Sequence, residues 1–175
     1  MGTGQMMLTI GAFVLLGVII LSVNAGFLTV NTTVYSSRVD IMAVSLANSI
    51  IEDAASLAFD EKTVGAAITS TSSLTAPASL GLDGTENRSI VNSFDDFDDY
   101  NCYRTNPKLD TILVPGSTSK FIFSTYCAVD YVDPANPDNI SSTATYAKRL
   151  KLRTYLPGMT DTIRISKVYS YWYFR

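Results

Sequence analysis

Residues 6–28 read MMLTIGAFVLLGVIILSVNAGFL, and this uncharged stretch determines how the rest of the chain is organised. A helix of this length spans about 34 Å, which is enough to cross a hydrocarbon core of about 30 Å. A secretory signal peptide has a basic leader and a shorter apolar segment, but residues 1–5 contain no lysine or arginine. The stretch therefore predicts a membrane-inserted helix, with a cleaved signal peptide as the alternative.

The charge distribution divides the chain after this helix. None of the 13 basic and 16 acidic residues precedes Arg38, although the chain has 175 residues and a net charge of −3. The remainder has nearly the charge content of an ordinary soluble domain. We therefore expect a helix suited to lipid or to a bundle of copies, followed by a folded exported domain.

An amphipathic pattern continues the helix over residues 38–59. Apolar residues recur there at steps of three or four, as one face of a helix requires. They are Val39, Met42, Leu46, Ile50, Ala54 and Leu57, widened by Val44, Ala47, Ile51 and Ala55. Together with the apolar segment they predict one helix over residues 5–59, about 80 Å long, whose second half packs against the folded domain.

The remaining chain is predicted to form a loop and then an antiparallel sheet. Residues 60–119 are rich in serine, threonine, glycine and proline, which indicates a variable connection. Residues 120–175 alternate between apolar and polar side chains, as strands with one wet face do. Three strands are expected there, over residues 120–132, 145–156 and 161–175. Because helix and sheet are segregated along the chain, the predicted fold class is α+β.

The last predicted strand has two irregular features. Its apolar phase slips between Ile165 and Val168, where we expect a β-bulge. Five aromatic rings near its end alternate between two faces, with Tyr169, Tyr171 and Tyr173 on one and Trp172 and Phe174 on the other. Packing in the core or in an interface is the expected use of these rings.

The absence of histidine excludes many activities. Ser-His-Asp and Cys-His catalysis, His-ligated zinc or haem, and imidazole pH switching all need that residue. Two cysteines are too few for a thiolate zinc site or an iron–sulfur cluster, and a pI of about 4.8 argues against nucleic acid as a partner. The sequence therefore predicts a protein that is not an enzyme.

Cys102 and Cys127 are predicted to form one structural disulfide, because an exported domain folds in an oxidising compartment. Two free thiols are the alternative. A redox-active pair needs a CxxC motif or a nearby base, and the sequence offers neither.

Two acidic segments are compared with calcium loops. Asp95, Asp96, Asp98 and Asp99 lie in the run FDDFDDYNCY, and Asp133, Asn136 and Asp138 lie in DPANPDN. Oxygen ligands on loops suit calcium, but neither segment has the spacing of a known calcium loop. The alternative is a solvated acidic loop whose Phe94 and Phe97 pack on the sheet or the helix. No cofactor and no firm metal site are therefore predicted, and calcium stays open.

Four features follow one another along the chain. A short leader, residues 1–4, ends in Gly4, and an uncharged helix begins at Gln5 with the residues QMMLT. This helix continues as an amphipathic helix through Phe59, and a loop then precedes the strands YAKRLKLRTYL and TIRISKVYSYWYF. This order resembles the type IV pilin and type II secretion pseudopilin superfamily over nearly the whole chain.

The resemblance implies processing at the leader. A prepilin peptidase would cut after Gly4 and methylate the new N-terminus at Gln5. Thr9 stands where the family usually has a glutamate, so the carboxylate-to-amine pair between subunits that is associated with that glutamate cannot form here. In this respect the chain is similar to divergent or minor members of the superfamily.

The resemblance also implies a structural subunit of an extracellular filament, with the apolar helix in the filament core and the sheet at its surface. The core helix residues expected to pack are Thr9, Gly11, Phe13, Leu16, Gly17, Ile20 and Gly26. The implied partners are the inner membrane before assembly, other copies of the chain, the prepilin peptidase and a pilus or secretion assembly machinery. The alternatives are a type II secretion pseudopilin in a periplasmic pseudopilus and a monomeric membrane-anchored exported binding domain.

Overall fold

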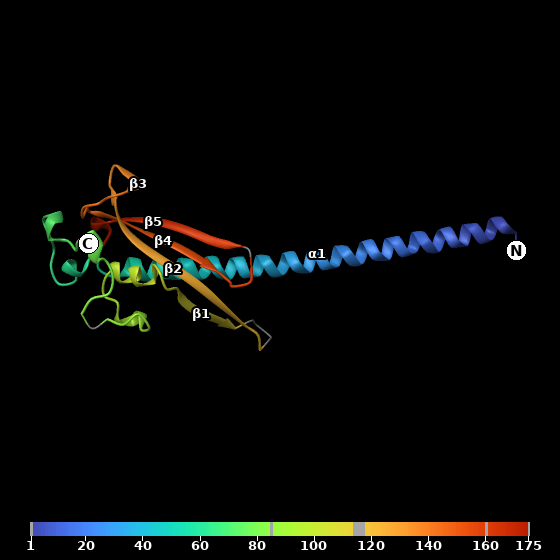
Figure 1. Ribbon diagram of the computed structural model, residues 1–175, viewed down its shortest axis with the longest axis horizontal. Helices are drawn as coiled ribbons and strands as arrows, with labels where there is room; N and C mark the ends of the chain where they lie inside the picture. Colours follow the sequence, from blue (N-terminus) through green and yellow to red (C-terminus); the bar gives the residue numbers. More distant parts are fainter. Residues whose placement is uncertain (1, 85, 114–117, 160, 175) are drawn as a thin grey trace. The chain divides into compact units, whose positions relative to one another are not determined.

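The computed structural model describes residues 2–84, 86–113, 118–159 and 161–174, so Met1 of the predicted leader and Arg175 lie outside it. The chain divides into two units, Met1–Ile41 and Met42–Arg175, which are described in turn. Helix α1, Thr3–Ser56, belongs to both units and is continuous in Figure 1. The predicted helix over residues 5–59 is confirmed, apart from small shifts at its two ends.

The first unit consists of the part of α1 up to Ile41. Its described residues carry no strand and no second helix. The polar patch at residues 31–33, which contains two β-branched threonines, stays helical. Local helix propensity therefore does not interrupt the element.

The second unit contains the end of α1, a segment of short 3₁₀ helices, and a sheet. The 3₁₀ helices are η1 (Glu61–Thr63), η2 (Thr71–Ser73), η3 (Pro77–Ser79), η4 (Val91–Ser93), η5 (Asp98–Tyr103) and η6 (Tyr171–Phe174). The strands are β1 (Lys108–Leu113), β2 (Lys120–Asp133), β3 (Asn136–Ile140), β4 (Ala147–Tyr155) and β5 (Thr162–Ser170). The predicted α+β class, with a helix packed on a small antiparallel sheet, is confirmed.

The sheet has five strands in the described residues instead of the three expected. Its order is β1-β2-β4-β5, with β3 paired to the end of β2, and every pairing is antiparallel. Figure 1 shows β1 and β5 at opposite edges. Strand β1 lies within residues 60–119, which were expected to be a loop, and β3 lies in the DPANPDN segment. Both are short, and β3 is fully exposed and built from poor strand formers, so neither carries the alternating apolar signal of a buried strand.

The predicted bulge between Ile165 and Val168 is wrong. The register between β4 and β5 is unbroken from Ala147↔Ser170 to Tyr155↔Thr162. The apolar phase slips because Val168 faces away from the core on an edge strand, where it stays 40% exposed. The irregularity of this sheet lies instead where β2 meets β3, between Val132 and Asp133.

The last strand ends at Ser170 instead of continuing to the predicted end, but the predicted alternation of the rings holds for Tyr169, Tyr171 and Trp172. The chain turns there into η6, which buries Tyr171 and leaves Trp172 exposed. The hydroxyl of Tyr171 accepts a hydrogen bond of 3.1 Å from the backbone N–H of Ile68. The side chains of Tyr173 and Phe174 lie outside the described part of the structure.

The main core of the second unit lies between the end of α1 and the sheet. The predicted apolar stripe is largely confirmed, because Ala47, Ile50, Ile51 and Ala54 are buried there. The sheet contributes Cys127, Val129, Leu150 and Leu152, and the preceding segment contributes Phe94, Phe97, Tyr100 and Tyr103. Each fully buried large side chain of this kind contributes about 1.5–3 kcal/mol. The stripe has one exception, since Val44 is 38% exposed.

Candidate functional site

The apolar part of α1 is the first candidate site. Every large apolar side chain between residues 6 and 30 is exposed, including Phe13 at 73%, Leu16 at 51% and Ile20 at 58%. By length and composition, α1 is the one helix among the described residues able to cross a membrane. A membrane anchor and a signal sequence share this property. Apolar surface of this extent requires lipid or other protein.

The hydroxyl groups of Thr9, Thr29, Thr32 and Thr33 are satisfied inside the helix. The Thr9 hydroxyl donates a hydrogen bond of 2.9 Å to the carbonyl of Met6. Those of Thr32 and Thr33 donate to the carbonyl of Thr29 at 2.8 and 2.9 Å. Hydrogen bonds of this kind remove the cost of placing a hydroxyl in an apolar medium. The threonines are therefore compatible with lipid or with a closely packed bundle.

The predicted core helix residues divide into two groups. Helical periodicity places Thr9, Phe13, Leu16, Gly17 and Ile20 along one face, at steps of three and four. Gly11 and Gly26 lie on the other side of the helix. A Cβ added to Gly11, Gly17 or Gly26 would meet no atom within 4 Å, so these glycines leave room for an approaching partner. Gly4 and Gln5, the predicted processing residues, lie in the first two turns of α1.

A buried ion-pair network in the second unit is a site that the sequence analysis missed. The ammonium of Lys148 on β4 lies 2.9 Å from Asp60 Oδ2 and 2.6 Å from Asp98 Oδ2. It also donates a hydrogen bond of 2.8 Å to the carbonyl of Phe59. Lys148 and Asp60 are fully buried and Asp98 nearly so. Three charged side chains from distant parts of the sequence thus meet in the interior.

Two further side chains form hydrogen bonds with the carboxylate of Asp60. The Tyr131 hydroxyl lies 2.8 Å from Asp60 Oδ2, and the Thr75 hydroxyl donates to Asp60 Oδ1 at 2.9 Å. The ammonium of Lys148 also lies 4.5 Å from the ring centroid of Phe59 and 4.9 Å from that of Tyr131. Buried charges are tolerated when they are paired and hydrogen-bonded. This network therefore ties the segment after α1 to β2 and β4.

The carboxyl groups in and beside the network differ in their affinity for protons. Burial raises the pKa of Asp60, but the charge of Lys148 and hydrogen bonds from Lys148 and Tyr131 outweigh burial and lower that pKa. Burial raises the pKa of Asp98 to about 7, against the attraction of Lys148. Burial and the charge of Asp98 raise the pKa of Asp96 to about 8. One carboxylate therefore stays charged beside Lys148, while its neighbours take up protons near neutral pH.

The predicted calcium candidates do not form one group. Asp96 and Asp98 are buried, and Asp96 Oδ1 accepts hydrogen bonds from the backbone N–H groups of Asp98 and Asp99. Asp95 and Asp99 instead lie with Glu86, with ligand atoms within 4.8 Å of one another. Phe94 and Phe97 are buried as the alternative expected, but three of the four aspartates are buried as well, so the segment is not a solvated loop.

The second candidate segment is a hairpin. Asp133 Oδ1 accepts a hydrogen bond of 2.9 Å from the N–H of Ala135, which caps the turn between β2 and β3. Asn136 and Asp138 lie on β3 and are exposed. No group of three acidic ligands forms here among the described residues.

The predicted disulfide is not formed. Both cysteines are free thiols, with Cys127 buried in the core and Cys102 half-buried. Burial raises the pKa of both thiols to about 12, so each behaves as a small apolar side chain at neutral pH.

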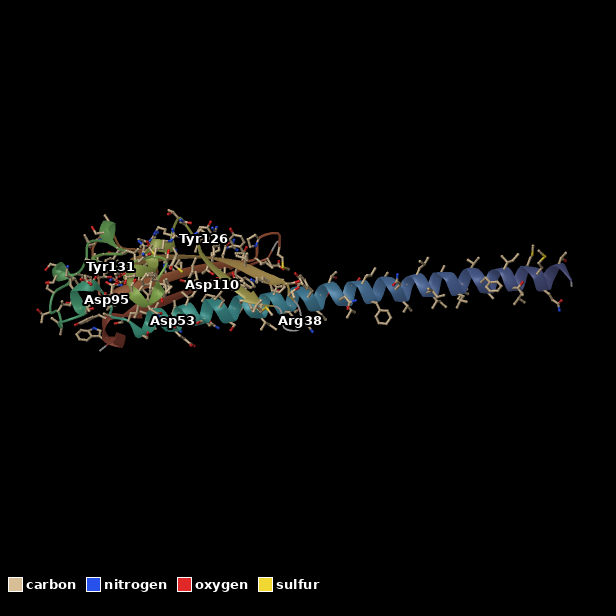
Figure 2. The ribbon with its side chains drawn as sticks, turned by 90° about the horizontal axis from the view of Figure 1, so that it is seen from below. Arg38, Asp53, Asp95, Asp110, Tyr126 and Tyr131 are labelled. Atoms are coloured by element: carbon tan, nitrogen blue, oxygen red, sulfur yellow. The ribbon has the colours of Figure 1, made fainter. Side chains whose placement is uncertain are left out.

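The face of the sheet turned away from α1 carries a basic groove. Its volume is about 330 Å³, and Lys151, Arg153, Arg164, Arg104 and Tyr126 are among the residues that line it. The guanidinium of Arg153 lies 4.4 Å from the ring centroid of Tyr126. Figure 2 shows Tyr126 on the side of the sheet opposite to α1. Among the described residues, Arg104 is the one cation of this groove that forms an ion pair, with Asp130.

No family model, curated protein or solved structure matches this chain.

The network was missed although the sequence contained a signal for it. Alternation along β4 places Lys148 on the same face as Leu150 and Leu152, which is the buried face. A lysine on a buried face predicts acidic partners from elsewhere in the chain. The partners themselves, Asp60 and Asp98, lie 88 and 50 residues away, and no local pattern identifies them.

Proposed function

We propose that this chain is a structural subunit of a pilin-like extracellular filament, in which the apolar part of α1 forms the filament core and the β-sheet unit forms the surface. The observation that carries the proposal is that every large apolar side chain between residues 6 and 30 is exposed, in a helix that continues without a break into a folded unit. Before assembly the apolar part of α1 lies in the inner membrane, and on assembly other copies of the helix replace the lipid around it.

The chemistry of the helix supports packing against other helices. Lipid tails are as apolar as leucine, so helices associate in a membrane through close packing and not through the hydrophobic effect. Gly11, Gly17 and Gly26 have open space around them, and the threonine hydroxyls make no demand on a partner. The role proposed is structural and not catalytic.

Processing belongs to the same proposal. A prepilin peptidase removes residues 1–4, and Gln5 becomes a methylated N-terminus. Mass spectrometry of the protein purified from its native membrane tests this step. A peptide beginning at methylated Gln5 is expected, and an intact N-terminus at Met1 would contradict it.

Cysteine cross-linking tests assembly itself. Phe13→Cys and Ile20→Cys are placed singly and together in a chain that also carries Cys102→Ser and Cys127→Ala, and the cells are oxidised. A filament predicts cross-linked dimers from the single variants and ladders of successive copies from the variant with both cysteines. Ser142→Cys, on an exposed loop of the second unit, is the control for random collisions. A monomeric anchored binding domain predicts no product above this control.

A further inference from the structure

The apolar part of α1 offers neighbouring copies close packing but no charged contact. In this chain Thr9 hydrogen-bonds within its own helix and offers no charge to a neighbour. If copies of the chain assemble in one register, ion pairs that help to set it have to come from the folded unit.

The basic groove holds three cations that form no ion pair with a carboxylate in the described part of the chain. Arg153 on β4 and Arg164 on β5 are directly opposite each other, and Lys151 lies two residues from Arg153 on the same face. Like charges at opposed positions of two strands destabilise a sheet. All three side chains are exposed, and none forms an ion pair with a carboxylate of the described residues. This arrangement favours an anionic partner from outside the subunit.

The same unit carries an acidic patch formed by Glu61, Asp83, Glu86 and Asp95. The carboxylate of Glu86 accepts hydrogen bonds from the backbone N–H groups of Asp83 and Asp95, at 2.9 and 3.2 Å. The charges of Asp83 and Asp95 act on Glu61, and those of Glu86 and Asp83 act on Asp95. Asp83 and Asp95 are exposed. Lys62 is a cation of the same chain that acts on Glu61, so the four carboxylates leave an excess of negative charge that favours a cationic partner.

The two charged surfaces are separate. Asp95 and Tyr126 occupy different places on the second unit in Figure 2, and Tyr126 lies in the basic groove. One subunit therefore cannot satisfy both surfaces at once by closing on itself. A contact between unlike patches is heterologous, and heterologous contacts build rings or open helical polymers instead of closed two-fold dimers.

We propose that the basic groove of one copy binds the acidic patch of the next copy, and that this contact sets the register of the polymer. The inference rests on the proposed filament function and deepens it by naming the surfaces that meet. The groove brings Lys151 and Arg164 to Asp83 and Asp95 of the neighbouring copy. Arg153 stays stacked on Tyr126 and shapes the groove between them.

Charge reversal tests the contact in the full-length chain. Lys151→Glu with Arg164→Glu should reduce the polymerised fraction about fivefold. The effect is moderate because each exposed ion pair contributes little to the contact. Asp83→Lys with Asp95→Lys should have a similar effect. The variant with all four substitutions restores opposite charges across the contact and should recover assembly. Pelleting after detergent removal, at low and at high salt, measures the polymerised fraction of each variant. High salt should reduce this fraction in both the wild type and the four-substitution variant, because salt screens the opposite charges in each.

Zero-length cross-linking with a carbodiimide locates the contact. Assembly from equal amounts of light and isotope-labelled chains should give mixed cross-links between Lys151 and Asp83 or Asp95. Such links, together with rescue in the four-substitution variant, would support the inference. If both charge-reversed variants polymerise as well as the wild type, the inference is overturned and the filament proposal stands. A wild-type chain that never polymerises overturns both.

Discussion

The apolar segment of α1 and the interior of the second unit differ in where they place apolar and charged side chains. Residues before Arg38 carry no charge, and their large apolar side chains are exposed between residues 6 and 30. The second unit instead places Lys148, Asp60 and Asp98 in its interior. One region therefore has surface that only another molecule can cover, while the other has charges whose partners are all supplied by the same chain.

This difference shows that burial depends on the partners a side chain has and not on its polarity alone. A phenylalanine at position 13 is 73% exposed because nothing in its own unit packs on it, whereas Lys148 is fully buried between two carboxylates. The interior of the second unit is self-sufficient in this respect, and the apolar helix is not.

The largest effect is expected when the second unit loses its buried cation. Lys148→Ala leaves Asp60 and Asp98 facing each other in the interior, and breaking a buried pair in this way costs about 3–5 kcal/mol. Denaturant unfolding followed by the fluorescence of Trp172, the single tryptophan, measures the free energy of unfolding. Lys151→Ala, an exposed lysine on the same strand, is the control and should change it by less than about 0.5 kcal/mol. If the two variants lost the same free energy of unfolding, the buried network would contribute no more to stability than an exposed lysine does.

A charge in the apolar helix has the second largest expected effect. Leu16→Arg places a cation where no partner exists, at a cost of about 2.5–3.5 kcal/mol for membrane insertion. The fraction of protein that stays in the membrane after alkaline extraction measures this cost. Leu16→Ala keeps the segment apolar and should remain membrane-bound. Full retention of the arginine variant would mean that this face of the helix is not in lipid.

The dependence of stability on pH comes next. Asp96 has a raised pKa of about 8, so between about pH 4 and 8 the folded state holds a proton that the unfolded state releases. Stability therefore falls as pH rises through this window, and Asp98 acts in the same direction up to about pH 7. Asp60, whose pKa is lowered, opposes this trend only in acid, where its contribution is lost as pH falls below the usual carboxyl pKa.

Asp96→Asn isolates this contribution. The asparagine keeps an oxygen to accept the N–H groups of Asp98 and Asp99 but cannot ionise. It should reduce the fall in unfolding free energy between pH 5 and 8 by on the order of 4 kcal/mol, since this window covers about three pH units and each corresponds to about 1.4 kcal/mol. Asp138→Asn, on exposed β3, is the control. A wild-type profile that rises over this range would contradict the assignment.

The smallest effect is expected at the cysteines. Because both are free thiols, adding a reductant should change the free energy of unfolding by less than about 0.5 kcal/mol, whereas loss of a disulfide closing this loop would cost about 3 kcal/mol. Alkylation without reductant should label two thiols after unfolding and few before it. If the thiols can be labelled only after a reductant is added, Cys102 and Cys127 form a disulfide and the assignment as free thiols is wrong.

The elements that could be predicted from sequence are those with a long, local pattern. The apolar stretch, the stripe from Val39 to Leu57, and strands β2, β4 and β5 show patterns that extend over many residues, and the structure contains the helix and these three strands. Strand β1 and hairpin strand β3 are five or six residues long and depend on pairing with β2, which no local pattern encodes. The buried network could not be predicted for the same reason. Lys148 on a buried face indicates that an acidic partner exists, but no local pattern identifies that partner as Asp60 or Asp98.

Electron cryo-microscopy of the full-length chain after detergent removal tests the central claim most directly. The account predicts helical filaments in which Phe13, Leu16 and Ile20 of each copy are covered by the helices of neighbouring copies. A chain that stays monomeric, with these side chains in contact with detergent or lipid alone, would contradict it.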